Sequence, residues 1–232
     1  MPIAADAWLA ERFGHPVWTV RDEPARSVLE HVAGSPGRAL YQAKVDANDV
    51  ATVLELAAAG LVPVNVNTLL ARAPGGEAAE PNAGLEVREV QPTDTDLAAV
   101  AERSFSKTRF HLDPRVPDIV ADRVKRDWVV SYLEGTRGDT AYVALRDGHL
   151  LGFLLVLATP TERVIDLMGV AAEARGAGVG AALVGRFVAE SADCCQAVRV
   201  GTQAANPGGT RFYETQGFRA AGAVYDLHRL EG

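Results

Sequence analysis

Residues 175–180 have the sequence Arg175-Gly176-Ala177-Gly178-Val179-Gly180, and the patterns on either side give this stretch its meaning. The apolar run at 164–170 predicts a strand before it, and the run at 181–190 predicts a helix after it. A strand that enters a glycine-rich turn at a helix N-terminus directs several free backbone N–H groups at one point. The helix dipole adds partial positive charge there, and glycine lets a ligand approach the backbone closely. The stretch therefore predicts a binding site for a phosphate or pyrophosphate group.

The spacing of the glycines indicates which kind of nucleotide would bind. The stretch lacks the Gly-Lys-Ser/Thr ending of a P-loop, so hydrolysis of a nucleoside triphosphate is not expected. A Rossmann fingerprint needs another order of glycines, although Asp193 stands near the distance of its acidic residue. The pattern Arg-x-x-Gly-x-Gly after a strand resembles the acetyl-CoA pyrophosphate loop of the GCN5-related N-acetyltransferase (GNAT) superfamily. The alternative is a glycine-rich helix entry that binds no ligand.

Length, charge and composition narrow the class of protein. The 232 residues suffice for one large domain or two small ones, and 48% of them are hydrophobic. A net charge of -7 argues against nucleic acid as a main partner, and apolar runs such as 150–158 are too short to cross a membrane. The N-terminus lacks the basic flank and apolar core of a signal peptide. The adjacent Cys194 and Cys195 are expected to be free thiols, so we expect a cytoplasmic protein.

A polar, proline-bearing connector at 73–83 is predicted to divide the chain. Before it, the patterns predict strands at 17–21, 39–45 and 61–70, a helix at 23–33, and a second helix that Asn48 caps and Gly60 ends. After it, they predict a strand at 85–90, a helix capped by Thr93 or Asp94 that runs to Phe105, a mostly helical segment at 115–133, a hairpin of 140–145 and 150–159 around Asp147-Gly148, the strand at 164–170, the helix at 181–190, a strand at 198–203, a helix from Asn206 to Gln216, and a last strand at 218–230.

The order of these elements is also that of the GNAT fold. The resemblance therefore implies an α/β protein, with an α+β mixed sheet, whose catalytic domain spans 84–232. Residues 48–61 repeat the pattern of 206–218, namely a capped helix, a glycine, an apolar residue and a strand. We therefore interpret residues 1–72 as a partial GNAT-like domain.

The resemblance implies acetyl-CoA as the cofactor and assigns residues to it. Backbone N–H groups of the turn would face the pyrophosphate, and the preceding strand would bind the pantetheine arm and polarise the thioester carbonyl. The implied cofactor-binding residues are Met168, Gly169, Val170, Arg175, Gly176, Ala177, Gly178, Val179, Gly180 and Ala181. Of these, Val170 is expected beside the reacting carbonyl.

Two residues of the following helix complete the expected cofactor site. Tyr213 is the candidate acid, because a phenol with a pKa near 10 is protonated at neutral pH and can return a proton to a leaving thiolate. The alternative for Tyr213 is an ordinary core aromatic. Asn206 is expected to contact the cofactor arm, or to act as a helix N-cap, or to do both.

The segment 109–114 is expected to lie over the acceptor cleft. Together with Trp128 and with Trp8, Phe13 and Gly14, it resembles the bacterial dTDP-sugar N-acetyltransferases, in particular the dTDP-4-amino-4,6-dideoxygalactose (dTDP-fucosamine) N-acetyltransferases. The implied substrate-binding residues are Arg109, Phe110, His111, Asp113 and Trp128. Arg109 could pair with a nucleotide diphosphate, or form a salt bridge with Asp113.

The base that deprotonates the amine is left open by the sequence. His111, Asp113, Glu11 and a chain of water molecules are all candidates. The strand after Gly60 carries Asn65 and Asn67 where the relatives tend to have acidic residues, so a carboxylate in that role is missing or has moved. The scattered histidines lack ligand spacing, so no metal is expected.

These observations predict an N-acetyltransferase that joins acetyl-CoA and a small amine, most simply on a dTDP-linked deoxyamino sugar, by direct attack in a ternary complex. The alternatives are a GNAT enzyme that acts on another small amine, an antibiotic or a protein N-terminus, and a non-catalytic acyl-CoA-binding protein. A homodimer is possible for this superfamily.

Overall fold

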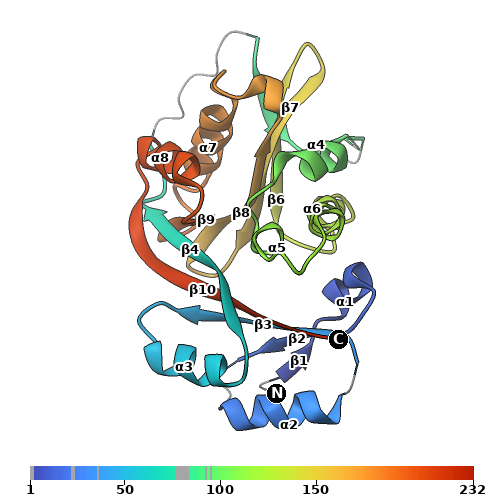
Figure 1. Ribbon diagram of the computed structural model, residues 1–232. Coiled ribbons are helices and arrows are strands. Elements are labelled where there is room, and N and C mark those ends of the chain that lie inside the picture. The colour runs from blue at the N-terminus through green and yellow to red at the C-terminus, as the bar shows by residue number, and fades with distance from the viewer. Residues whose placement is uncertain (1–2, 22–23, 36, 77–83, 92, 95) are drawn as a thin grey trace.

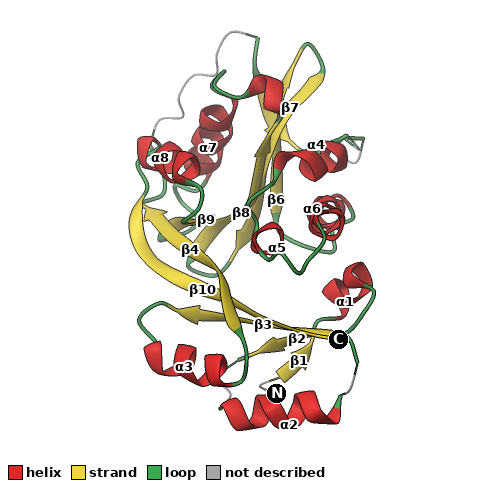
Figure 2. Cartoon of the chain, in the orientation of Figure 1, coloured by secondary structure: helices red, strands yellow, loops and turns green. Residues whose placement is uncertain are grey.

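A ten-stranded mixed sheet with helices on both faces forms the centre of the computed structural model (Figure 1, Figure 2). The structure describes residues 3–21, 24–35, 37–76, 84–91, 93–94 and 96–232. The strands lie in the order β1-β2-β3-β10-β4-β9-β8-β7-β6-β5. The predicted class, an α/β protein with a mixed sheet, is confirmed.

The N-terminal half contains four strands and three helices. They are β1 (Ile3–Ala5), α1 (Ala7–Phe13), β2 (Val17–Val20), α2 (Ala25–Gly34), β3 (Ala39–Asp46), α3 (Val50–Ala58) and β4 (Val62–Arg72). The patterns did not predict β1 and α1. The prediction that Asn48 caps α3 is wrong, because Asp49 is the N-cap and accepts a hydrogen bond from the Thr52 N–H, whereas Asn48 binds Asp46.

The C-terminal half follows the predicted order of elements. They are β5 (Glu86–Glu89), α4 (Leu97–Ser104), α5 (Arg109–Leu112), α6 (Asp118–Leu133), β6 (Thr140–Arg146), β7 (His149–Ala158), β8 (Glu162–Val170), the 3₁₀ turn η1 (Ala172–Ala174), α7 (Val179–Glu190), β9 (Ala197–Gln203), α8 (Pro207–Thr215) and β10 (Arg219–Glu231). The predicted turn at Asp147-Gly148 is confirmed, with φ of 51° and 76° at its two residues.

Two details of this half differ from the prediction. The short helix α5 lies within the segment that was expected to be a loop. The helix α4 begins at Leu97, so a cap at Thr93 or Asp94 is wrong. Asp94 instead accepts two hydrogen bonds from the guanidinium of Arg88. A carboxylate that receives such a bidentate pair is held there rather than at the helix end.

The last strand of each half, β4 or β10, pairs with strands of the other half. Parallel β2 and β3 enclose α2 in the sequence, as parallel β8 and β9 enclose α7. However, β3 pairs with β10 and β9 pairs with β4, both antiparallel. The strands β4 and β10 pair with each other at the centre of the sheet. Neither half therefore forms its sheet alone.

The helices α3 and α8 end in the same way. Gly60 and Gly217 have φ of 82° and 83°, a left-handed conformation that favours glycine. The next residue, Leu61 or Phe218, is buried and donates its N–H to the helix carbonyl five residues before it. This shared geometry agrees with the repeat found in the sequence. Of the predicted connector, residues 77–83 lie outside the described residues.

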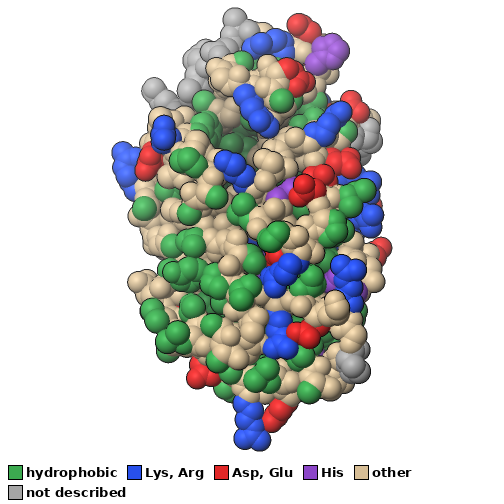
Figure 3. All heavy atoms as spheres, viewed as in Figure 1, with side chains coloured by type: hydrophobic (Ala, Val, Ile, Leu, Met, Phe, Trp, Pro, Cys, Tyr) green, Lys and Arg blue, Asp and Glu red, His purple; other side chains and the backbone are tan. Residues whose placement is uncertain are grey.

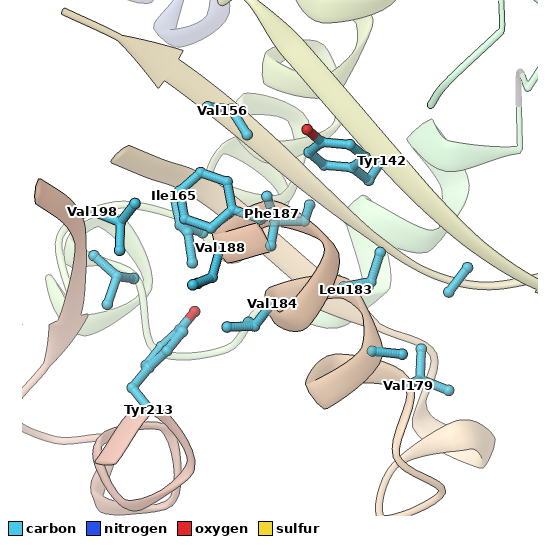
Figure 4. Close-up of a cluster of buried hydrophobic side chains, with 14 of the residues drawn as sticks. Tyr142, Val156, Ile165, Val179, Leu183, Val184, Phe187, Val188, Val198 and Tyr213 are labelled. Atoms are coloured by element: carbon cyan, nitrogen blue, oxygen red, sulfur yellow. The ribbon is translucent and has the colours of Figure 1, made fainter. Parts of the chain in front are cut away.

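Alternate side chains of β6 supply two of the four hydrophobic cores of the described residues. On β6, Tyr142 and Ala144 pack under α7 together with residues of α8, whereas Val143 and Leu145 pack under α4 and α6. Figure 4 shows part of the first core, in which Val184 and Phe187 of α7 face the sheet. The sheet therefore fixes α7 and α8 on one face, and α4 and α6 on the other.

Candidate active site

The parallel strands β8 and β9 separate in the middle of the sheet. They pair from Glu162 and Ala197 as far as Ile165 and Val200, although β8 continues to Val170 and β9 to Gln203. A bulge in β8 lies at the point of separation, because the register with β7 skips Asp166. A β-bulge bends its strand and increases the twist. The second half of β8 therefore turns away from β9 and leaves a wedge-shaped opening between them.

Asp166 is fixed in this bulge by three side chains from one side. Its carboxylate accepts hydrogen bonds from Trp128 Nε1 at 2.7 Å, from the Tyr132 hydroxyl at 2.9 Å and from Arg137 Nε at 2.9 Å. Burial of Tyr132, and then the negative charge of Asp166, raises the pKa of the Tyr132 hydroxyl. Since its lone pairs are engaged by these donors, Asp166 is a structural anion and a poor acceptor for another proton.

The glycine turn follows β8 directly and opens α7. Gly176 and Gly178 have φ of 79° and 83°, so side chains at these positions would be strained. Gly178 is the N-cap, and the first turn of α7 leaves the N–H groups of Val179, Gly180 and Ala181 without acceptors within the helix. These groups and the helix dipole make the end of α7 a site for an anion.

A cavity of about 900 Å³ occupies the opening between the strands and extends to the N-terminal half. Ten of the sequence-predicted cofactor residues line it: Met168, Val170, Arg175, Gly176, Gly178, Val179, Gly180, Ala181, Asn206 and Tyr213. Gly169 and Ala177 belong to the same segment but do not line the cavity. Gly169 has a packing role, since a Cβ there would lie 2.7 Å from Phe153.

Tyr213 of α8 both lines the cavity and belongs to the core under α7. Its hydroxyl points toward Val184 and Val188 of α7 (Figure 4). Burial raises the pKa of Tyr213, so the phenol is protonated at neutral pH. Tyr213 is therefore a core aromatic that also lines the cavity, and its role as the acid stays a prediction. Asn206 is the N-cap of α8 and accepts a hydrogen bond from the Gly209 N–H, and it also lines the cavity.

At the other end of the cavity, polar side chains form a row across the neighbouring strands β3, β10 and β4. Lys44 on β3, Asp226 on β10 and Asn65 on β4 are neighbours in register. Asn65 donates a hydrogen bond of 2.7 Å to Asp226 Oδ2. Among the described residues, nothing donates a hydrogen bond to the buried atoms Asp226 Oδ1 and Asn67 Oδ1. Buried acceptors that lack donors indicate a place where a ligand or water completes the site.

Arg109 covers this polar row from α5. Its Nη2 donates to Gln42 Oε1 at 2.8 Å, and its Nη1 lies 3.6 Å from Asp226 Oδ1. Of the two alternatives for Arg109, the salt bridge with Asp113 is not formed, because Asp113 pairs with Arg115. Burial lowers the pKa of Arg109, although Asp226 opposes the shift. The predicted residues Phe110 and Trp128 line the cavity beside Arg109.

His111 and Asp113 point elsewhere. His111 lies between Thr108 and Asp122, at 2.6 and 3.0 Å from their oxygens. Asp113 is fully buried, where it binds Arg115 and the ring of His228. Neither residue lines the cavity. Glu11 is also distant, since its exposed side chain pairs with Arg12.

The sequence reasoning missed four charged residues of the cavity: Lys44, Lys125, Asp166 and Asp226. The Lys44 side chain is accessible from the cavity. Its pKa is nevertheless lowered, chiefly because the surrounding protein displaces water from the ammonium group and then because of the charge of Arg109. One signal was present, because only three of the 23 basic residues are lysines, namely Lys44, Lys107 and Lys125. Asp226 had no such signal, because its position beside Asn65 depends on the pairing of β4 and β10.

The remaining expectations concern the surface and metals. On the face shown in Figure 3, basic and acidic side chains are interspersed rather than gathered into one basic stripe. Within the described ranges, no helix is long and apolar enough to cross a bilayer. The same part of the chain contains no cluster of three His, Cys, Asp or Glu side chains suited to a metal ion. Both cysteines are free thiols.

Comparison with known proteins gives a family and a relative. The sequence pattern of the Acetyltransferase (GNAT) family matches residues 100–218, about half of the chain. A segment of 149 residues is 29% identical to the "Spore coat polysaccharide biosynthesis protein SpsD" of Bacillus subtilis (strain 168). This match covers 63% of the chain and 51% of SpsD. The chain thus spans about half the length of the curated relative it matches.

Solved structures share the fold at low identity. The GCN5-related N-acetyltransferase from Kribbella flavida matches with a TM-score of 0.64 and 15% identity, over 100% of this chain and 88% of that one. A tandem GNAT protein from the clavulanic acid biosynthesis pathway matches with a TM-score of 0.65 and 16% identity, over 94% and 76% of the two chains. The fold implied by the sequence resemblance is confirmed.

Proposed function

Because the chain belongs to the acetyltransferase (GNAT) family, we propose that it transfers the acetyl group of acetyl-CoA to the amine of a small acceptor. The observation that carries this proposal is the separation of β8 from β9 directly before the glycine turn. Unpaired backbone groups along the second half of β8 can hydrogen-bond an extended amide-bearing arm, as a neighbouring strand would. The first turn of α7 offers N–H groups to a pyrophosphate at the end of that arm.

The residues present fit coenzyme A. The glycines of the turn leave space for a phosphate, since a Cβ at Gly176 would meet no atom within 4 Å. The guanidinium of Arg175 donates to the Val170 carbonyl at 3.4 Å and brings a positive charge to the same turn. When bound, acetyl-CoA supplies an acetyl group activated as a thioester. Tyr213, which lines the cavity in its protonated form, is the residue we assign to return a proton to the departing sulfur.

For the acceptor we propose a dTDP-linked deoxyamino sugar. A sugar hydroxyl or amine could donate to Asp226 Oδ1 and Asn67 Oδ1, the two buried acceptors without a donor among the described residues. Lys44 and Arg109 would balance a diphosphate, because guanidinium and ammonium groups both bind phosphate oxygens. The name of SpsD, a protein of polysaccharide biosynthesis, supports a sugar substrate. Both ends belong to one cavity, which supports direct attack in a ternary complex.

Two measurements test the proposal in sequence. Titration calorimetry with coenzyme A tests the cofactor site, and we expect heat of binding in the micromolar range that Gly178→Asp removes. A thiol-release assay with acetyl-CoA then compares dTDP- and UDP-amino sugars, free amino sugars and peptides with a free N-terminus. Release that depends on a dTDP-amino sugar supports the finer assignment. Thiol release with a peptide acceptor alone would show that the acceptor is a protein N-terminus instead. Absence of coenzyme A binding would refute the proposed acetyltransferase activity.

A further inference from the structure

Lys125 of α6 is a cation in the cavity without a matching anion. Its ammonium nitrogen lies 4.5 Å from the centre of the Trp128 ring and 5.6 Å from that of Phe105. Within the described residues, no carboxylate oxygen lies within 4.0 Å of it. On its own helix, Asp122 binds His111 and Asp127 binds Arg12. The side chain is thus enclosed by aromatic rings that hold its position but provide no counter-charge.

The charged groups around Lys125 come from four other segments. Arg109 of α5, Lys44 of β3 and Arg137 after α6 are all positive, and the carboxylate of Asp166 is already taken by its own donors. Asp226 of β10 lies in the same cavity but is bound by Asn65 and faces Arg109. Burial, followed by the charge of Arg109, lowers the pKa of Lys125 to about 7. The attraction of the two rings for the ammonium is too weak to reverse this shift.

Lys125 is also close to the strand that would hold the thioester. Phe105, which contacts Lys125, directly follows Ser104. The Cβ of Ser104 lies 3.3 Å from the position that a Cβ on Gly169 would take. Gly169 lies in the second half of β8, which borders the wedge between the strands. A short chain of contacts therefore links Lys125 to the place expected for the reacting carbonyl.

The choice of lysine rather than arginine at this position is informative. The chain uses arginine for nearly all of its cations, and its three lysines are Lys44, Lys107 and Lys125. Two of the three line the cavity. Arginine remains charged at every relevant pH, whereas a buried lysine can lose its proton near neutrality. Lys44 has the carboxylate of Asp226 as a neighbour in register, which leaves Lys125 as the lysine suited to be neutral.

We propose that Lys125 is the general base that deprotonates the acceptor amine. The inference rests on the proposed function and names the residue that performs its first step. The ammonium of the acceptor gives one proton to the lone pair of Lys125 Nζ. The freed amine nitrogen then bonds to the acetyl carbon, and the C–S bond breaks with its electron pair on sulfur. Tyr213 gives its proton to the sulfur, and the second proton lost by the nitrogen restores the Tyr213 phenol, so the net proton is the one that Lys125 returns to solvent.

The first test needs neither cofactor nor acceptor. Lysine labelled with ¹³C at Cε gives one NMR signal for each of the three lysines, and Lys125→Arg assigns the signal of Lys125. We expect this signal to titrate near pH 7. Titration of Lys125 above pH 9 would overturn the proposal, whatever the outcome of the acetylation assays. The same spectra show whether the variant is folded.

The second test uses the dTDP-amino sugar that gives the fastest thiol release, with both substrates saturating. For the wild type, kcat should rise tenfold per pH unit below about pH 7 and then become constant. Lys125→Met and Lys125→Arg should both lower kcat by about 100-fold at pH 7.5 and remove this pH dependence. Lys107→Arg is the matched control, and its profile should equal that of the wild type.

The arginine variant separates a base from a binding cation. If Lys125 only attracts an anionic part of the acceptor, Lys125→Arg should keep the wild-type kcat and change KM alone, and this result would overturn the proposal. Methylamine added to a Lys125→Ala variant should restore part of the turnover, because a small amine can enter the space and accept the proton. Absence of coenzyme A binding in calorimetry would instead identify a failure of the proposed function itself.

Discussion

The indole N–H of Trp128 donates a 2.7 Å hydrogen bond to Asp166 Oδ2 and so ties the middle of α6 to the bulge of β8. The bulge is the point at which β8 leaves β9, and Trp128 also forms part of the cavity wall. One contact therefore connects the opening that we propose for the cofactor with the wall of the proposed acceptor pocket. The position of Lys125, whose ammonium lies over the Trp128 ring, depends on the same contact.

Removing the carboxylate should have a large effect on stability. Asp166→Ala leaves the partly buried donors of Trp128 and Tyr132 without this partner, and each unsatisfied group costs about 1–3 kcal/mol. We expect urea unfolding to show a loss of about 3 kcal/mol in the free energy of unfolding. Trp128→Phe should lose more than Trp18→Phe, because the buried Trp18 Nε1 has no acceptor among the described residues. Equal losses would show that the hydrogen bond to Asp166 contributes nothing.

Gly178 should control cofactor affinity through both backbone and charge. Its φ of 83° makes any side chain strained by about 1–2 kcal/mol, so Gly178→Ala should weaken coenzyme A binding modestly. Gly178→Asp adds a negative charge where the pyrophosphate would lie and should abolish binding in calorimetry. Gly148→Asp is the control, since Gly148 has φ of 76° in a hairpin turn outside the cavity lining. Retained affinity in Gly178→Asp would contradict the assignment of the turn.

Tyr213 and Tyr142 should respond to loss of the hydroxyl in opposite ways. Tyr213→Phe should lower kcat at least 100-fold while leaving coenzyme A affinity and the melting temperature nearly unchanged. Tyr142→Phe should leave kcat unchanged but reduce stability by about 1–2 kcal/mol, because the Tyr142 hydroxyl donates to Glu190 outside the cavity. Steady-state kinetics and thermal melts of both variants provide the comparison. Full activity in Tyr213→Phe would leave the acid to be found elsewhere.

The sequence predicted the parts of this site that depend on local patterns. A glycine turn between a strand and a helix is determined by neighbouring residues, and Gly176 and Gly178 have the positive φ that such a turn requires. The N-cap Asn206 was found for the same reason, since its side chain bonds to the Gly209 N–H three residues away. Asn48 was wrongly chosen over Asp49 because adjacent capping residues give nearly identical patterns.

The polar end of the cavity depends on contacts between distant segments. Asn65 and Asp226 are 161 residues apart in the sequence. They meet only because β4 and β10 pair across the two halves. A carboxylate, that of Asp226, lies beside Asn65 on the neighbouring strand of the sheet. Likewise, Arg109 lines the cavity, but its partner Asp226 could not be found from the sequence within 109–114.

The buried pair of His228 and Asp113 should make stability depend on pH. Burial lowers the pKa of His228, so below its ordinary value of about 6.5 the unfolded chain binds a proton that the folded protein does not. The free energy of unfolding should therefore fall as pH decreases below 6.5, by up to about 1.4 kcal/mol per pH unit. His228, Arg115 and their hydrogen bonds lower the pKa of Asp113, so its contribution is present above its unfolded value and is lost below about pH 4.

Variants of two histidines separate this effect from general acid sensitivity. His228→Gln should be less stable than the wild type at pH 8, because the hydrogen bond to Asp113 is weakened, but should lose the slope between pH 6.5 and 5. His149→Gln is the control, since His149 is exposed and should leave the slope unchanged. Urea unfolding at pH 8, 6.5 and 5 measures all three proteins. An unchanged slope in His228→Gln would assign the acid sensitivity to other groups.

We propose that residues 1–72 are a partial copy of the GNAT unit. The two halves depend on each other because β4 and β10, the last strand of each half, pair with strands of the other half. Residues 84–232 expressed alone lack β4, which pairs with both β9 and β10 and contributes the buried Leu70 to the core under α7. Two strand edges and an apolar surface would then be exposed, and such edges promote aggregation.

This fragment should be insoluble or unable to bind coenzyme A. Expression of residues 1–76 in the same cells should restore a soluble complex of the two pieces, because β4 can return to its place between β9 and β10. Gel filtration identifies the complex, and calorimetry with coenzyme A shows whether the wedge between β8 and β9 has formed. A fragment 84–232 that is monomeric, melts as the full chain does and binds coenzyme A would demonstrate that the C-terminal half folds without β4.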